Sequence, residues 1–139
     1  MRVIPKPTDA ALRRLERAAR GALAHAYSPY SRFRVAAAVI AGSGKVYPGC
    51  NVENASYGLC NCAERTAIFT AIAAGEKSIR AVAVYTPTPL PTAPCGACRQ
   101  VINEFGPEAL VICVCDSKNR IETTLQSLLP GAFGPGDLA

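Results

Sequence analysis

Two short motifs hold four residues that could build a metal-dependent catalytic site. Cys95 and Cys98 form a Cys-x-x-Cys pair, and Cys62 precedes Glu64 by two residues. A Cys-x-x-Cys pair alone is typical both of redox centres and of half a metal site. The only histidine, His25, belongs to neither motif, so any zinc site here must be built mainly from thiolates.

Three thiolates and one glutamate favour a catalytic over a structural metal. A structural zinc has four protein ligands, whereas a catalytic zinc keeps one position for water. Cys62, Cys95 and Cys98 would leave that position open, and Glu64 would lie beside it. Burial in an otherwise apolar helix would raise the pKa of Glu64, which suits a group that takes a proton from water and then gives it away.

The charge of such a site needs compensation. Three thiolates and Zn²⁺ sum to a formal charge of about −1, which opposes ionisation of a bound water. Both motifs open predicted helices, whose N-termini stabilise thiolates. Arg65 follows Glu64 directly, and we expect its guanidinium to donate a hydrogen bond to a thiolate sulfur.

The elements that must position these residues alternate between helix and strand. Apolar spacing predicts a first helix that starts at Thr8 or Asp9 and ends before Ser28. A proline at position 48 suits an edge strand. The other predicted elements are strands at 33–41, 45–53, 79–85 and 109–115, helices at 62–74 and 95–105, and a short strand with a helical turn at 125–129. This order predicts an α/β fold, a three-layer α/β/α arrangement with a central mixed sheet of about five strands.

Composition narrows the class of protein. The chain has 139 residues, of which 50% are hydrophobic and 18% charged, so we expect one packed domain over residues 1–139. No apolar run reaches the roughly 18–20 residues of a membrane span, and the first 14 residues lack the apolar core of a signal peptide. Seven cysteines, an odd number, favour reduced thiols and a cytoplasmic location. The dispersed charge of +5 argues against a nucleic-acid partner.

A resemblance to a known family makes the metal motifs specific. Cys-x-Glu followed by Pro-Cys-x-x-Cys is a signature of zinc nucleobase deaminases. The segments NVENASYGLCNCAERTA (51–67) and PCGACRQ (94–100) closely resemble the small homotetrameric cytidine deaminases. SPYSRFRVAAAV (28–39) and LLPGAFGPGDL (128–138) are also similar to that family, so the resemblance spans nearly the whole chain.

The resemblance implies a function and a role for each matching residue. It implies that zinc-activated hydroxide deaminates cytidine and deoxycytidine to uridine and deoxyuridine, releasing ammonia, in pyrimidine salvage. Zinc would be bound by Cys62, Cys95 and Cys98, with Glu64 as general acid and base. Asn51 and Glu53 would bind the ribose hydroxyls, Phe33 would pack on the pyrimidine, and the backbone at Ala63 would contact the base. Tyr57 and Phe133 would enter the pocket of a neighbouring subunit in a homotetramer.

A strand over 45–53 would support the ribose pair independently. Asn51 and Glu53 are two residues apart, so in a strand their side chains leave the same face. Without the metal motifs, both would be ordinary polar residues at a strand end. Phe33 could equally be a core aromatic, and Phe133 could tie down the C-terminal tail. Cys50, Cys60, Cys113 and Cys115 are expected to be buried as small hydrophobic residues.

Three other functions remain open at this point. A related deaminase could act on another aminopyrimidine, such as a nucleotide or blasticidin S. An enzyme that edits RNA or DNA would need an electrostatic groove for the backbone, of which the sequence gives no sign. A non-catalytic zinc module would need a fourth protein ligand and would have no use for Glu64.

Overall fold

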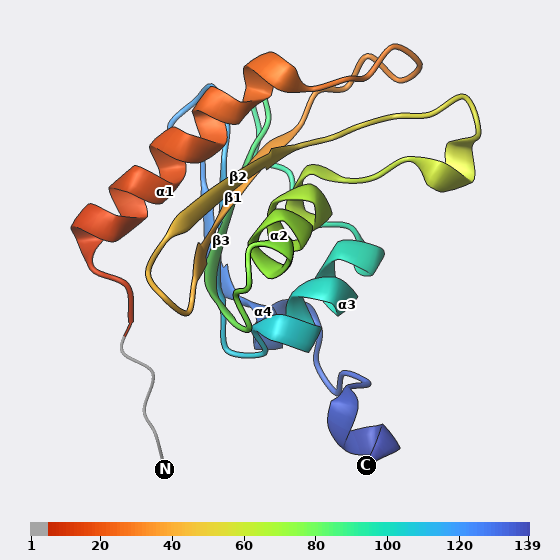
Figure 1. Ribbon diagram of the computed structural model, residues 1–139. Coiled ribbons are helices and arrows are strands. Elements are labelled where there is room, and N and C mark those ends of the chain that lie inside the picture. Colours follow the sequence, from red (N-terminus) through yellow and green to blue (C-terminus); the bar gives the residue numbers. More distant parts are fainter. Residues whose placement is uncertain (1–5) are drawn as a thin grey trace.

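The central element is a five-stranded mixed sheet, seen in the computed structural model of the chain, which describes residues 6–139 (Figure 1). The first five residues of the predicted 1–139 domain lie outside this range. The strand order is β2-β1-β3-β4-β5; β3 and β4 pair in parallel, and the other neighbours are antiparallel. The strands are β1 Ala36–Ala41, β2 Val46–Cys50, β3 Ile79–Tyr85, β4 Leu110–Val114 and β5 Ile121–Thr124. The predicted mixed sheet is confirmed.

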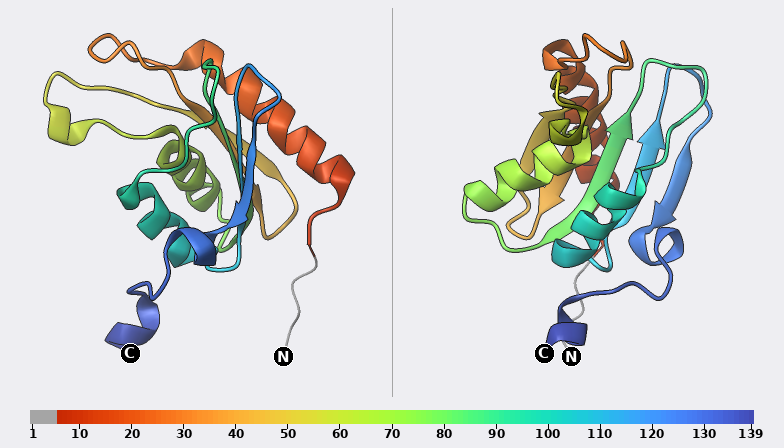
Figure 2. Two further views of the ribbon diagram at one scale, coloured as in Figure 1. Left: turned by 180° about the vertical axis from the view of Figure 1, so that it is seen from behind. Right: turned by 90° about the vertical axis from the view of Figure 1, so that its right-hand side faces the viewer.

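Helices cover both faces of the sheet, which confirms the three-layer prediction (Figures 1 and 2). α1 lies on one face, and α2, α3 and α4 lie on the other. Their bounds are α1 Asp9–Ala22, α2 Ala63–Ala73, α3 Gly96–Phe105 and α4 Leu125–Leu128. Thr8 caps α1 by accepting a hydrogen bond from the Ala11 amide at 3.1 Å. Within the described residues, no helix has the length and apolar character that crossing a membrane requires.

Alternation along β1 separates the two halves of the core. All six residues of β1 are buried. Ala37 and Val39 belong to the cluster that packs under α2 and α3, whereas Ala38 and Ile40 pack with Leu15 of α1. A strand buried on both faces has no polar side, which explains the continuous apolar run in the sequence.

Two strand ends differ from the predictions where the chain changes its pairing partner. β1 begins at Ala36, not at residue 33, and β2 ends at Cys50, not at residue 53. Beyond these points the Asn51 amide still donates to the Val35 carbonyl at 3.0 Å, but the Val35 amide donates to Asn51 Oδ1 at 3.0 Å. The Asn51 carbonyl instead accepts from the Tyr27 amide at 2.9 Å. Pro48 does lie in an edge strand, β2, as predicted.

Candidate active site

Two helix N-termini bring the three predicted thiols together. Cys62 is the N-cap of α2 and Cys95 is the N-cap of α3, while Cys98 is buried in the first turn of α3. The Cys62 and Cys95 sulfurs are 3.8 Å apart, and those of Cys95 and Cys98 are 3.5 Å apart. All three sulfurs lie within 4.8 Å of one another.

This spacing suits zinc. Zn–S bonds of about 2.3 Å in tetrahedral geometry place two sulfurs about 3.8 Å apart. Among residues 6–139, no fourth His, Cys, Asp or Glu joins the group. Three protein donors are the number that a catalytic zinc uses, which counts against a structural module.

Glu64 lies at the start of α2, next to the thiol cluster. Only 4% of the residue is exposed to solvent. Burial raises the pKa of Glu64, and the negative charge of Cys62 raises it further. A raised pKa makes a carboxyl a better proton acceptor, and it can return the proton later in a reaction.

Arg65 contacts the cluster as the sequence predicted. Its Nη2 donates a hydrogen bond to the Cys62 sulfur at 3.2 Å. Hydrogen bonds from Cys98 and then from Arg65 lower the pKa of the Cys62 thiol to about 5. The Arg65 Nε is buried and has no hydrogen-bond partner among the described residues. The guanidinium therefore offers positive charge to the thiolates.

A cavity of about 270 Å³ opens beside the thiols and Glu64. Phe33, Asn51, Glu53 and Ala63, the four residues predicted to contact the nucleoside within one chain, all line it. Sequence reasoning missed the other residues of its wall, which are Ser31, Val35, Cys60, Asn61, Val84, Thr92 and Ala93. Ser31 lies inside a segment that carried the resemblance, two residues before Phe33, but no rule of spacing singles it out.

Asn51 and Glu53 lie just beyond the end of β2 at Cys50. Val52, between them, still pairs with Tyr27 and Asn61, and the side chains on either side of it both line the cavity. The Asn51 Nδ2 donates to the Phe33 carbonyl at 2.8 Å, and the Glu53 carboxylate accepts from the Tyr30 and Ser31 amides at 2.9 and 3.1 Å. Side-chain hydrogen bonds to the loop before β1 orient both residues.

Tyr57 and Phe133 lie outside the cavity. Tyr57 is 73% exposed and Phe133 is 58% exposed. The Tyr57 ring contacts only one described aromatic, Tyr30, edge-on at a centroid distance of 5.9 Å. One chain therefore does not bring these two aromatics to its own thiol cluster.

The prediction of four buried cysteines was half right. Cys113 and Cys115 are buried, but Cys50 and Cys60 are only partly buried. Cys50 lies at the end of the edge strand β2, and Cys60 lines the cavity, so neither has packing on all sides.

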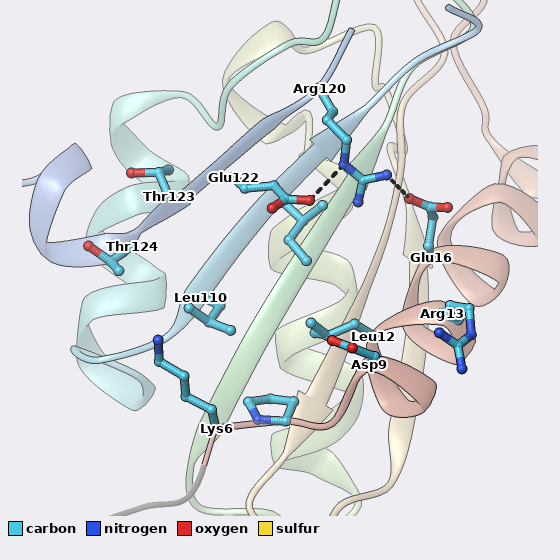
Figure 3. A pocket seen from close by; sticks show the side chains of 12 residues that line it. Lys6, Asp9, Leu12, Arg13, Glu16, Leu110, Arg120, Glu122, Thr123 and Thr124 are labelled. Carbon is cyan, nitrogen blue, oxygen red and sulfur yellow. Dashed lines mark ion pairs between the residues drawn. The ribbon is translucent and has the colours of Figure 1, made fainter. Parts of the chain in front are cut away.

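A second, larger cavity of about 630 Å³ lies on the opposite face of the sheet, between α1 and strands β4 and β5 (Figure 3). Its floor includes Leu12 and Leu110. Arg120 spans its rim, with an ion pair to Glu16 at 3.1 Å and another to Glu122 at 2.8 Å (Figure 3). No thiol lines this cavity, so the smaller one is the candidate active site.

Comparisons with known proteins agree with this assignment. Residues 10–114 match the family model described as the cytidine and deoxycytidylate deaminase zinc-binding region. The chain is 50% identical over 115 residues to a cytidine deaminase of Sporosarcina psychrophila, covering 82% of this chain and 85% of that protein. The crystal structure of cytidine deaminase from Burkholderia pseudomallei has a TM-score of 0.83 and 51% identity, covering 91% of this chain and all of that one. Cytidine deaminase from Mycobacterium tuberculosis has a TM-score of 0.75 and 37% identity, covering 92% and 99% of the two chains.

Proposed function

The chain belongs to the zinc-dependent cytidine and deoxycytidylate deaminase family, and from this premise we propose that it hydrolyses both cytidine and deoxycytidine. It is a hydrolase with zinc as its cofactor, and the Cys62, Cys95 and Cys98 cluster is suited to hold that ion. One observation carries the proposal: the buried carboxyl of Glu64 lies beside the three thiols at the wall of a cavity.

Glu64 would move the protons of the reaction. When bound, zinc supplies the Lewis acidity that lowers the pKa of water towards neutrality. Glu64 would accept the proton of the water that attacks C4 of cytosine and would donate it to N3. It would then take the remaining proton of that water from the C4 hydroxyl and pass it to the amino group, so that the C4–N bond breaks, ammonia leaves and the C4 carbonyl forms. Arg65 would reduce the negative charge on the Cys62 sulfur throughout.

The wall of the cavity favours an uncharged nucleoside over a nucleotide. Among its lining residues none is Lys, Arg or His, and Glu53 contributes a carboxylate. That carboxylate would repel a phosphate but can accept a hydrogen bond from a sugar hydroxyl. Phe33 would pack on the pyrimidine, Asn51 and Glu53 would bind the sugar, and the Ala63 backbone would contact the base.

The wider setting follows from the same premise. Tyr57 and Phe133 would complete the pockets of neighbouring subunits in a homotetramer, which accounts for two large aromatics left exposed on one chain. Thiols that must stay reduced suit the cytoplasm. Release of uridine and deoxyuridine would place the enzyme in pyrimidine salvage.

Glu64→Ala tests the proposal. We expect the zinc-loaded variant to keep one zinc per chain and to lose turnover of cytidine by at least about 100-fold, the usual contribution of a positioned acid or base. The fall in ultraviolet absorbance on cytidine deamination reports the rate. Glu104→Ala, which alters an exposed carboxylate on α3, is the matched control and should keep full activity. Full activity of Glu64→Ala would refute the assigned role.

The substrate is tested with a panel of cytidine, deoxycytidine, dCMP and blasticidin S. We expect turnover of the first two and little of dCMP, because no Lys, Arg or His among the described residues lines the cavity, whereas Glu53 does. A preference for dCMP or blasticidin S would replace the nucleoside assignment while leaving the deaminase chemistry intact.

A further inference from the structure

Glu53 is held almost entirely by the loop that precedes β1. Its Oε1 accepts hydrogen bonds from the Tyr30 amide at 2.9 Å and from the Ser31 amide at 3.1 Å. Its Oε2 accepts a third hydrogen bond, from the Ser31 hydroxyl. An ionised carboxylate has about four acceptor positions, so about one is left for a ligand.

The same hydroxyl also orients Phe33. The Phe33 amide donates to Ser31 Oγ at 3.0 Å, while Asn51 holds the Phe33 carbonyl from the other side. A serine hydroxyl has one hydrogen to donate. That hydrogen is donated to Glu53, so the hydroxyl oxygen accepts the hydrogen bond from Phe33. The hydroxyl therefore links the backbone of Phe33 to the Glu53 carboxylate.

We propose that Ser31 is a positioning residue of the nucleoside pocket, which fixes Glu53 and Phe33 relative to each other and leaves Glu53 one acceptor for a sugar hydroxyl. The proposal rests on the proposed function. Ser31 itself lines the cavity, so the arrangement lies at the site and not behind it. The hydrogen bonds from Ser31 and Tyr30 also lower the pKa of Glu53, which keeps the carboxylate an acceptor at neutral pH.

Ser31→Ala removes the hydroxyl and tests the proposal. A contact made equally in the ground state and in the transition state contributes uniform binding, and its loss raises KM while kcat stays unchanged. We expect KM for cytidine to rise about tenfold, with kcat within about twofold and an unchanged zinc content. Ser31→Thr keeps a hydroxyl and should restore a KM near that of the wild type.

Ser43→Ala is the matched control because Ser43 repeats the arrangement away from the cavity. The Ser43 hydroxyl donates to Glu76 at 2.5 Å, its amide donates to the same carboxylate at 3.3 Å, and the Lys45 amide donates to Ser43 Oγ at 3.3 Å. This control loses an equivalent set of hydrogen bonds, so it should alter the melting temperature alone. An equal rise of KM in both variants would reduce Ser31 to a stabilising residue and overturn the proposal.

A double-mutant cycle with Glu53→Gln tests whether Ser31 acts through the carboxylate. If it does, the KM effects of the two single variants add up to more than the effect of the double variant. Full additivity, or an unchanged KM in Ser31→Ala, would overturn the proposal. If Ser31→Ala does not fold, Ser31→Cys, with its weak S–H donor, should show an intermediate rise. A wild type that deaminates no nucleoside would refute the proposed function; an active wild type with unaffected Ser31 variants would refute the positioning role alone.

Discussion

The buried carboxyl of Glu64 should make the stability of the folded protein depend on pH. Burial raises the pKa of Glu64 in the folded state above the ordinary value of about 4.3. The protonated carboxyl therefore makes its full contribution to stability only when the pH is below about 4.3. Its contribution to stability is lost as the pH rises through the folded-state pKa. In zinc-free, reduced protein, Glu64→Gln should therefore melt at a higher temperature than the wild type at pH 7.5.

The same comparison at pH 4 provides the control. There the wild-type carboxyl is protonated in the folded state and mostly protonated in the unfolded state, so the difference in melting temperature should shrink. Thermal unfolding followed by circular dichroism measures both values. A wild type more stable than Glu64→Gln at pH 7.5 would show that the carboxylate is stabilised by contacts outweighing its burial.

Arg65 should control how protons and zinc compete for Cys62. Without its hydrogen bond, the pKa of the Cys62 thiol should rise from about 5. Arg65→Gln should then weaken zinc binding by about 10–100-fold, as for other residues that hydrogen-bond metal ligands. The loss should be larger at pH 6 than at pH 8, because protons compete better for a less acidic thiol.

Competition with a chromogenic chelator measures that affinity, with Arg80→Gln as the control. Arg80 is partly buried and donates to the Gly42 carbonyl, so it resembles Arg65 in burial but not in its partner. Equal affinities of Arg65→Gln and the wild type at both pH values would remove Arg65 from the charge balance of the site.

Among single residues, the sequence identified those that carry reactive groups. Cys62, Cys95, Cys98 and Glu64 stand out because thiolates and a buried carboxyl have few other uses in such a pattern. Ser31 was missed, because it lies in no spacing motif of a reactive serine. Its proposed role depends on a hydrogen bond to a carboxylate 22 residues away.

Among the elements, α2 matters most, because it carries Cys62 at its cap and Glu64 in its first turn. It packs closely on β2 at Gly49, where an added Cβ would lie 2.4 Å from the Ala67 amide nitrogen and 2.7 Å from the Ala63 carbonyl oxygen. Gly49→Ala should thus displace the helix start, with a loss of about 1–3 kcal/mol of unfolding free energy, typical of overpacking.

Chemical denaturation and zinc content should both report the Gly49→Ala change. Gly21→Ala is the control, because no atom lies within 4 Å of an added Cβ at this position in α1. That control should be neutral or slightly stabilising, since alanine favours a helix over glycine. Retention of full zinc affinity in Gly49→Ala would mean that the thiol cluster tolerates movement of α2.

The element types were predictable from apolar periodicity, whereas their ends near the site were not. The predicted helix at 62–74 became α2 with a shift of one residue at each end. The strand predicted over 45–53 ended three residues early, because the chain beyond Cys50 pairs with Tyr27 and Asn61 and no longer with β1. Periodicity detects burial, and it cannot detect a change of pairing partner.

In the whole molecule, the two faces of the sheet carry different features. The face under α2 and α3 carries the thiols, and the opposite face carries α1 and the cavity around Arg120 (Figure 3). If Tyr57 and Phe133 act where we propose, one chain supplies only part of the lining of each pocket. A single sequence cannot reveal assembly directly, because an exposed aromatic has the same local pattern whether or not a partner covers it.

Mixing two defective chains can test whether the pockets are shared. Phe133→Ala would lack the aromatic lent to a neighbour, and Glu64→Ala would lack the proton carrier of its own pocket. If subunits share their pockets as proposed, a Phe133→Ala chain in a mixed assembly keeps its own Glu64 and can receive Phe133 from a Glu64→Ala neighbour. Coexpression should therefore give a cytidine deaminase activity well above the mean of the two separate variants. The Phe133 carbonyl is bound by Gln100 and Asn103, so the segment should stay in place when the ring is removed. An activity equal to that mean, from particles shown to be mixed, would mean that each pocket is completed by its own chain.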